Sequence, residues 1–241
     1  MNRLQWILDL GPPMARAPRV CRPEAFALFH SALTEIDSND GLLRGAMGMA
    51  KQVIPESSLA ETANRLAEIA ECVASRVSNP SPPALLAHLH AVLFEEEQFY
   101  GNFEDYYSPD NSLLPVVLAS RRGIPITLAL VYKLVAEPLG LTVEGINAPG
   151  HFLARIHAGD DTLLVDPFFH GQMLSQEEAY DRIGQVTGRP VVQADVLLQP
   201  ASHVQWLSRM LANLQNIFAS RQDAESLAAM SELHSLLEDA Y

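Results

Sequence analysis

The residues of this sequence that could do chemistry lie between positions 100 and 171, and His151 and Asp166 stand out among them. If residues 151–157 and 162–166 pair as the strands of a hairpin, these two side chains lie on neighbouring antiparallel strands. A carboxylate beside an imidazole can fix its tautomer and raise its basicity. The pair therefore predicts a general base, either alone or within a catalytic set.

A nucleophile for such a set would belong at the N-terminus of a helix expected over 124–139. A helix N-terminus lowers the pKa of a thiol, so cysteine is the natural choice there. Residues 124–127, Ile-Pro-Ile-Thr, contain no cysteine, and Cys21 and Cys72 occur in other segments. Thr127 is a poor substitute, because its hydroxyl pKa is high and threonine nucleophiles normally use a terminal amine as base.

Both members of the pair also have a structural interpretation. His151 could be a core histidine whose ring is hydrogen-bonded to Asp166, and Asp166 could cap a turn before Pro167. We give the core and the functional interpretations of His151 equal weight.

Arg121 and Arg122 could bind a carboxylate or phosphate of a ligand. Such a pair more often makes one buried ion pair and one solvated charge, and we favour that structural role. The preceding loop offers acidic partners, namely Glu104, Asp105 and Asp110. The same loop contains Tyr106 and Tyr107, which we expect to pack against the protein rather than stack on a ligand.

Asn111, Thr127 and His170 are further candidates for a binding site. Asn111, like Ser112, could instead cap the helix expected after the loop. His170 is close in sequence to Asp166 and could join its site, or it could be a loop histidine. The residues alone leave these alternatives open.

No combination of residues predicts a metal or a cofactor. His88 and His90 are two positions apart, so on a helix they point about 200° apart and cannot share a metal ion. The sequence has no glycine-rich phosphate loop, no His-Glu-x-x-His and no Gly-x-Ser-x-Gly.

The elements that must position these residues are predicted from periodicity and capping signals. Four helices are expected before residue 100, over 24–36, 41–53, 58–77 and from 81 onward, the third beginning at a capping box, Ser58-Leu-Ala-Glu61. A polar, aromatic loop over 100–111 leads to a short helix from Ser112 and a longer one from Pro125.

The pattern then changes to strands and back to helices. Strands are expected over 141–146, 151–156 and 162–165, separated by turns at 148–150 and 159–161. A helix with a second capping box, Ser175 to Glu178, comes next, followed by an extended segment over 190–198. Two amphipathic helices, 203–219 and 223–239, end the sequence.

Composition narrows the choice of partners. The 241 residues include 16 Lys and Arg against 29 Asp and Glu, a net charge of −13. The scarcity of bases disfavours binding to nucleic acid and to anionic membranes. Residues 61–120 hold only two bases but nine acids, which predicts a solvated acidic face or, less commonly, an acidic site rim.

Cys21 and Cys72 have no metal-ligand spacing and form no disulfide framework, which favours a reduced, cytoplasmic setting. Asp9 interrupts the apolar run of residues 1–10, so we expect no secretory signal. No stretch has the length of a membrane span. Residues 12–23, with four prolines, are predicted to form an irregular arm.

Taken together, a set of short motifs resembles the bacterial SirB family of the transglutaminase-like superfamily, over about residues 40–180. The motifs are Leu93-Phe-Glu-Glu-Glu97, Phe99-Tyr-Gly-Asn102, Asp105-Tyr-Tyr107, Pro109-Asp-Asn-Ser112, Arg121-Arg-Gly-Ile-Pro-Ile-Thr127, Pro149-Gly-His-Phe-Leu153 and Val165-Asp-Pro-Phe168.

The resemblance implies a papain-like α+β core in which a helix packs on a small antiparallel sheet. It places His151 and Asp166 at the catalytic His and Asp positions of transglutaminases and the missing Cys near Pro125. The SirB family shares this Gly-Ile-Pro-Ile segment, so we interpret the absence of the thiol as a family trait. The implied segments are a helical region (1–99), the transglutaminase-like core (100–198) and a shortened tetratricopeptide-like helical pair (199–241), which we expect to dock on the core.

Two functions remain. The preferred one is a non-catalytic binding, regulatory or scaffold protein that binds a protein or peptide through the cleft at His151 or through the C-terminal helices. The alternative is a peptidase- or amidase-like hydrolase in which His151 and Asp166 activate water. An open polar cleft at His151, with room for water near Pro125, supports the hydrolase, whereas Ile126 and aromatic side chains filling that space exclude it.

Overall fold

The structure, a computed structural model, describes residues 17–241. The apolar run at 1–10 and residues 12–16 of the predicted arm lie outside the described residues. None of the helices in the described part is both long and apolar enough to cross a membrane. The α-helices are α1 (Pro23–Leu33), α2 (Asn39–Val53), α3 (Leu59–Ala74), α4 (Pro82–His90), α5 (Leu114–Ser120), α6 (Pro125–Ala136), α7 (Gln176–Thr187), α8 (His203–Ser220) and α9 (Ala224–Glu238).

Shorter helical turns join these elements. A π-helical turn, η1 (Ala91–Glu96), continues α4, and four 3₁₀ turns follow: η2 (Pro109–Ser112), η3 (Glu137–Leu139), η4 (Pro167–Phe169) and η5 (Asp195–Leu198). The last of these corrects the prediction that 190–198 is simply extended.

Serine side chains begin several of the α-helices. Ser58 Oγ accepts the N–H of Glu61 at 3.2 Å. At Ser175 the full capping box forms, because Glu178 also accepts the N–H of Ser175, at 2.7 Å. These bonds satisfy backbone donors that have no partner within the helix.

The larger sheet is antiparallel, with the order β6-β5-β4-β3-β7. Its strands are β3 (Thr142–Ile146), β4 (Leu153–Ala158), β5 (Asp161–Asp166), β6 (Gln172–Leu174) and β7 (Pro200–Ala201). The predicted hairpin is formed by β4 and β5, with Ala154 opposite Val165. A separate parallel pair joins β1 (Tyr100–Gly101) to β2 (Arg122–Gly123).

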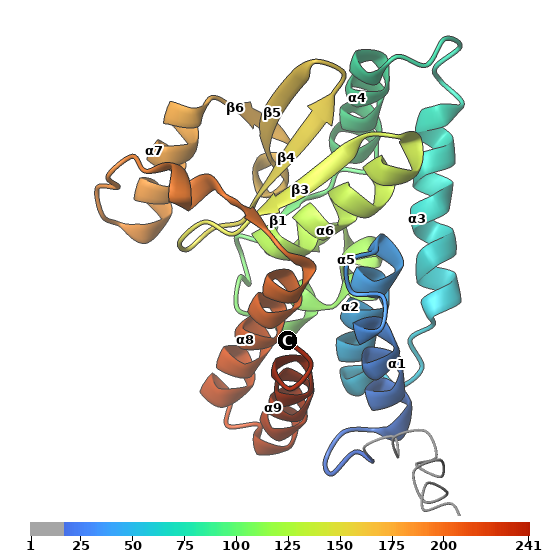
Figure 1. The fold of residues 1–241 in the computed structure, drawn as a ribbon, viewed down its shortest axis with the longest axis vertical. Coiled ribbons are helices and arrows are strands. Elements are labelled where there is room, and N and C mark those ends of the chain that lie inside the picture. Colours follow the sequence, from blue (N-terminus) through green and yellow to red (C-terminus); the bar gives the residue numbers. More distant parts are fainter. Residues whose placement is uncertain (1–16) are drawn as a thin grey trace, which may run out of the picture.

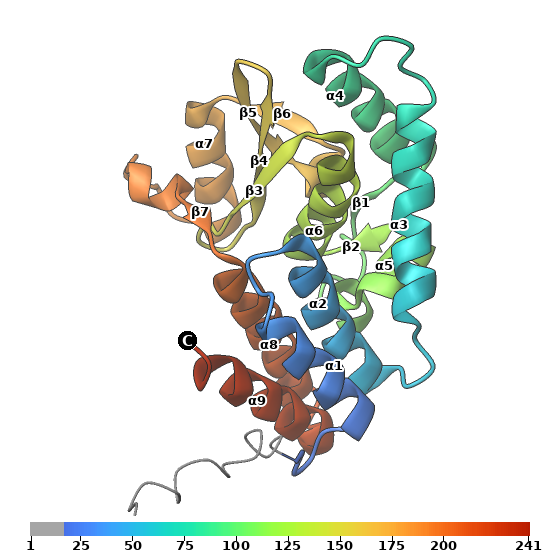
Figure 2. The ribbon, with the colours of Figure 1, turned by 45° about the vertical axis from the view of Figure 1, so that its right-hand side comes forward.

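The sheet is buried on both faces. Because side chains alternate along a strand, Ala154 and Ile156 face the core that contains α6, while Leu153 packs in a second cluster with α7. Figures 1 and 2 show α6 and α7 on opposite sides of the sheet. The chain is therefore an α+β protein, as predicted.

All three predicted segments contribute to the main core. Phe29 of α1, Leu128 of α6 and Trp206 of α8 belong to one cluster. The two C-terminal helices dock on this core as expected, and in Figure 1 they lie below the sheet and beside α1 and α2. The segment limits at residues 99 and 198 stay a prediction.

The chain before α1 is fixed to α9 by Glu232. Its carboxylate accepts the backbone N–H groups of Arg19, Val20 and Cys21 at 2.6, 2.7 and 2.8 Å. Burial by itself would raise the pKa of Glu232, but hydrogen bonds led by these three hold it below the ordinary value. This latch joins the described N-terminal end to the last helix.

Candidate functional site

His151 lies in a turn before β4, so the prediction that a strand starts at 151 is wrong. The N–H of His151 donates to Ala148 O at 3.2 Å, and Gly150 has a φ of 67°, which favours glycine. Arg209 of α8 also donates to Ala148 O, at 2.7 Å. Strand β4 begins only at Leu153, because the backbone before this residue belongs to the turn.

Asp166, at the end of β5, meets this histidine as predicted. His151 Nε2 lies 2.9 Å from Asp166 Oδ2. Since Asp166 engages Nε2, Nδ1 is the ring nitrogen left for proton transfer. The other carboxylate oxygen accepts the N–H of Phe168 at 3.2 Å, so Asp166 also caps a turn.

Arg182 of α7 binds the same carboxylate, a contact that no sequence pattern indicates. Its Nη1 donates to Asp166 Oδ2 at 2.7 Å, and its Nη2 donates to Gln172 Oε1 at 2.7 Å. The guanidinium also lies over the Phe169 ring, 3.7 Å from the centroid. Asp166 is therefore a fully buried carboxylate with a permanent cationic partner.

Aromatic rings pack around the histidine. The centroids of Phe168 and Phe169 each lie 6.1 Å from that of His151. Phe103 packs on these two rings, at 4.7 and 5.5 Å. A side chain at Gly101 would clash with Phe168, so this glycine gives the ring its place. As a result, only 2% of His151 is exposed.

The residues at the N-terminus of α6 are also buried. Pro125, Ile126 and Thr127 are all buried. Thr127 Oγ1 has no hydrogen-bond partner within residues 17–241. Apolar side chains therefore occupy the position expected for a nucleophile. The threonine hydroxyl there has no hydrogen-bond partner in the described part of the chain that could activate it.

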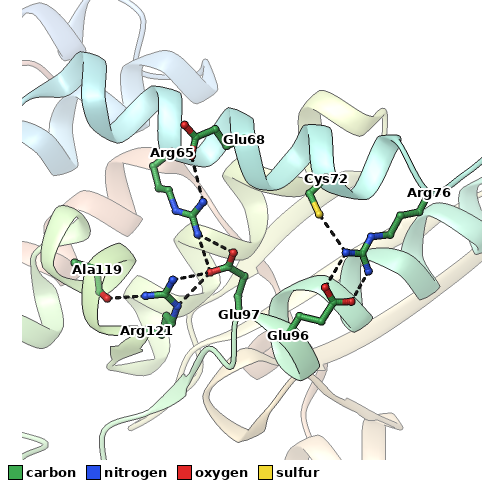
Figure 3. Close-up of polar contacts among 8 residues, drawn as sticks. All are labelled: Arg65, Glu68, Cys72, Arg76, Glu96, Glu97, Ala119 and Arg121. Carbon is green, nitrogen blue, oxygen red and sulfur yellow. Dashed lines mark hydrogen bonds and ion pairs between the residues drawn. The ribbon is translucent and has the colours of Figure 1, made fainter.

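The two thiols have their polar contacts elsewhere. Cys21 Sγ donates to Ala229 O on α9 at 3.1 Å, and burial, together with the charge of Glu232, raises its pKa to about 12. Cys72, on α3, accepts a hydrogen bond from Arg76 at 3.2 Å (Figure 3).

Arg121 makes an ion pair, but its partner is not in the acidic loop. Its Nη2 lies 3.0 Å from Glu97 Oε2, and Arg65 of α3 binds the same carboxylate at 2.7 Å (Figure 3). The expectation of Glu104, Asp105 or Asp110 as partner is therefore wrong. The reason is the β1–β2 pairing, which brings the end of η1 beside Arg121.

Arg122 and His170 share one aromatic ring. The Arg122 guanidinium lies over Tyr100, 3.3 Å from the ring centroid, and His170 stacks on Tyr100 at 4.8 Å. Arg122 Nη1 also donates to Gln98 O at 3.0 Å. The structure thus places His170 on Tyr100, with Arg122, and not on the His151–Asp166 pair.

Asn111 holds the loop before α5 together. Its Nδ2 donates to the carbonyls of Asp105 and Tyr106 at 2.6 and 3.1 Å, and its Oδ1 accepts from Asn102 at 2.9 Å. The expected cap by Asn111 or Ser112 is absent, because α5 begins without a side-chain cap.

The two tyrosines of this loop behave differently. Tyr106 packs edge-on against Phe168, as expected, with ring centroids 5.9 Å apart. Tyr107 is 74% exposed, which contradicts the expectation that both rings pack.

Another buried polar pair lies beside α6. His90 Nε2 lies 2.9 Å from the hydroxyl of Tyr132. Burial lowers the pKa of His90 to about 4, so its ring is neutral at pH 7. Nowhere in residues 17–241 do three or more His, Cys, Asp or Glu side chains gather closely enough to hold a metal ion.

One family model and several known proteins match this chain. Residues 60–212 match the family model described as the transglutaminase-like superfamily. A UPF0162 protein of Xylella fastidiosa (strain 9a5c) is 33% identical over 197 residues, which cover 80% of this chain and 70% of that protein. UPF0162 protein PA3419 of Pseudomonas aeruginosa is 26% identical over 197 residues, or 82% and 71% of the two chains.

F-box only protein 21 of Mus musculus is 37% identical over 109 residues, which cover 42% of this chain and 17% of that protein. The chain thus spans only part of each of these relatives. No solved structure matches it.

Proposed function

Because the chain belongs to the transglutaminase-like superfamily, we propose that it is a non-catalytic member whose role is to bind a protein or peptide partner. The observation that carries this proposal is the closure of the family's catalytic position. His151 is 2% exposed, Asp166 is paired with Arg182, and residues 124–127 contain no cysteine. The further assignment to the SirB family stays a prediction.

The alternative hydrolase requires water at His151. A general base must reach the proton it removes, directly or through one water molecule. The rings of Phe168 and Phe169 lie against the imidazole, and buried Ile126 follows Pro125. The packing of these rings and the burial of Ile126 support a structural role for the His151–Asp166 pair.

A partner surface is available next to this closed site. Phe103 and Tyr107 are 57% and 74% exposed, and both belong to the loop that packs on Phe168. Exposed aromatic side chains are enriched among the residues that dominate binding energy in protein interfaces. We call Phe103, Tyr106 and Tyr107 the aromatic loop surface.

This surface continues into a cavity of about 220 Å³ between the loop and α8, lined by Tyr106, Tyr107, Ile124, Asn213, Asn216, Ile217 and Ser220. None of these side chains is charged at pH 7. The Asn213 and Asn216 carboxamides make no hydrogen bond within residues 17–241. Free carboxamides beside aromatic rings suit an uncharged stretch of peptide, because an amide can both donate to and accept from its backbone.

The catalytic half of the proposal is tested by hydrolysis assays on a panel of amides and esters. The wild-type chain and His151→Gln are compared at equal concentration. We expect both to release product at the same background rate. Faster release by the wild type, lost in His151→Gln, would establish the hydrolase instead.

The binding half is tested by quantitative capture of proteins on the immobilised chain. Tyr107→Ser removes an exposed ring from the aromatic loop surface, and Val192→Ser is the matched control, because Val192 is exposed elsewhere. We expect the partner to be retained by the wild type and by Val192→Ser but lost with Tyr107→Ser. Equal retention by all three chains would rule out this surface.

A further inference from the structure

A larger cavity lies between the end of α2, the start of α3 and α5. Its volume is about 580 Å³, and it shares no lining residue with the cavity beside Tyr107. Ile54, Pro115, Val116 and Leu118 form its apolar wall. Its polar wall contains Ser57, Thr62, Arg65 and Arg121.

A buried hydroxyl on the polar wall has no hydrogen-bond partner. Ser57 is 8% exposed. Within residues 17–241, Ser57 Oγ makes no hydrogen bond. A buried hydroxyl without a partner is unfavourable, so a molecule that brings an oxygen acceptor here would be stabilised.

The charged side chains of this wall are already engaged with one another. Figure 3 shows Glu97 between Arg65 of α3 and Arg121, which follows α5. The Glu97 carboxylate receives Arg65 Nη2 at 2.7 Å and Arg121 Nε at 3.1 Å. Arg121 Nη1 also donates to Ala119 O at 2.8 Å. Both guanidinium groups are therefore already paired with a carboxylate and are not free to bind an anionic ligand.

The mouth of the cavity makes a charged ligand still less suitable. Glu56 and Glu61 are exposed lining residues. With Glu97 and Glu68, which binds Arg65, they set four carboxylates against Arg65, Arg121 and Lys51, whose Nζ donates to Ser57 O at 3.2 Å, so an anion is disfavoured. A cation would instead have to lie against hydroxyl and guanidinium donors and apolar groups deeper inside. The cavity favours an uncharged molecule.

We propose that this cavity binds an uncharged organic molecule with an apolar body and a carbonyl acceptor, such as an amide or an ester. The carbonyl oxygen accepts from Ser57 Oγ, and the apolar body lies on Pro115, Val116 and Leu118. The proposal is independent of the function proposed for the aromatic loop surface.

The test uses three probes with the same six-carbon chain: hexanamide, hexanoate and hexylamine. Each is titrated into the ¹⁵N-labelled full chain and followed by amide chemical shifts. We expect hexanamide to shift Ser57 to Thr62 and Val116 to Ala119 saturably, with hexanoate and hexylamine at least about tenfold weaker. Absence of saturable shifts at these residues, or stronger binding of either charged probe, would overturn the proposal.

Variants identify the polar contact. Ser57→Ala removes the hydroxyl and keeps the Cβ, so hexanamide should bind about tenfold more weakly. Ser235→Ala, at an exposed serine on α9, should leave the titration unchanged. Ala119→Trp fills the mouth from an exposed position and should abolish binding without altering the core. Binding by Ala119→Trp or Ser57→Ala equal to that of the wild type would contradict the assignment.

Discussion

Arg182 Nη1 and His151 Nε2 meet at a single oxygen of Asp166, at 2.7 and 2.9 Å. The carboxylate that would orient a catalytic imidazole is thereby also half of a buried ion pair between β5 and α7. The guanidinium gives this carboxylate a second partner besides the histidine. The arrangement suits a structural bridge across the sheet.

Removing Arg182 should therefore destabilise the fold. Arg182→Ala leaves a fully buried carboxylate without its cation, a change that costs about 3–5 kcal/mol in other proteins. Urea unfolding should show a fall of this size in the free energy of unfolding. The control is Arg44→Ala, because Arg44 pairs with Glu35 and Asp40 at the surface, and its loss should cost less than about 1 kcal/mol. Equal effects of the two substitutions would show that the Arg182 pair is not structural.

Removing the hydroxyl of Thr127 should stabilise the fold, in contrast to removing Arg182. Its hydroxyl is buried and has no partner within the described residues. Thr127→Val keeps the shape and removes the polar group, so the free energy of unfolding should rise by about 1 kcal/mol. We expect Thr127→Val to retain the binding partner as well as the wild type does. Weaker retention would show that the Thr127 hydroxyl takes part in binding.

His90 predicts how stability depends on pH. Burial lowers its folded pKa from 6.5 to about 4. Between these pH values the unfolded chain binds a proton that the folded chain does not, so stability is full above pH 6.5 and falls as pH drops to 4. The shift corresponds to about 3 kcal/mol. His90→Gln keeps a hydrogen-bond partner for Tyr132 but has no ring to protonate. Between pH 6.5 and 4 its free energy of unfolding should therefore fall by about 3 kcal/mol less than that of the wild type.

The control for this titration is His30→Gln. His30 is exposed on α1, and its removal should leave the pH dependence as in the wild type. Identical pH profiles for His90→Gln and the wild type would contradict the burial of His90 in its neutral form.

The Glu232 latch predicts different reactivities for the two cysteines. Burial and the nearby carboxylate raise the pKa of Cys21 to about 12, so a thiol reagent at pH 8 should label Cys72 alone. Glu232→Ala frees the backbone of residues 19–21, and Cys21 should then react at least about tenfold faster. Glu225→Ala, at an exposed position of the same helix, should change nothing. Rapid labelling of Cys21 in the wild type would refute the latch.

Local signals in the sequence predicted most of the elements. Ser58 and Ser175 mark the starts of α3 and α7, and the Gly159–Asp161 turn joins β4 to β5. These signals work because caps and turns depend on a few neighbouring residues. His151 was misplaced in a strand because the alternating pattern of 151–156 does not reveal that a turn uses the backbone at Ala148.

The contacts that hold the candidate site and the N-terminal latch could not be predicted from such local signals. Arg182 reaches Asp166 from α7, Arg209 reaches Ala148 from α8, and Glu232 holds residues 19–21 from α9. Each joins segments that are distant in the sequence and depends on how helices pack on the sheet. The wrong partner for Arg121 has the same origin, because only the β1–β2 pairing brings Glu97 beside it.

The most direct test of the account is the access of solvent reagents to His151. Diethyl pyrocarbonate modifies exposed histidines, and peptide mass spectrometry gives the rate at each one. His170 is exposed and serves as the internal reference. A closed, non-catalytic site predicts that His151 reacts at least about a hundredfold more slowly than His170 in the folded chain. Modification of His151 at a rate close to that of His170 would show an open base and contradict the account.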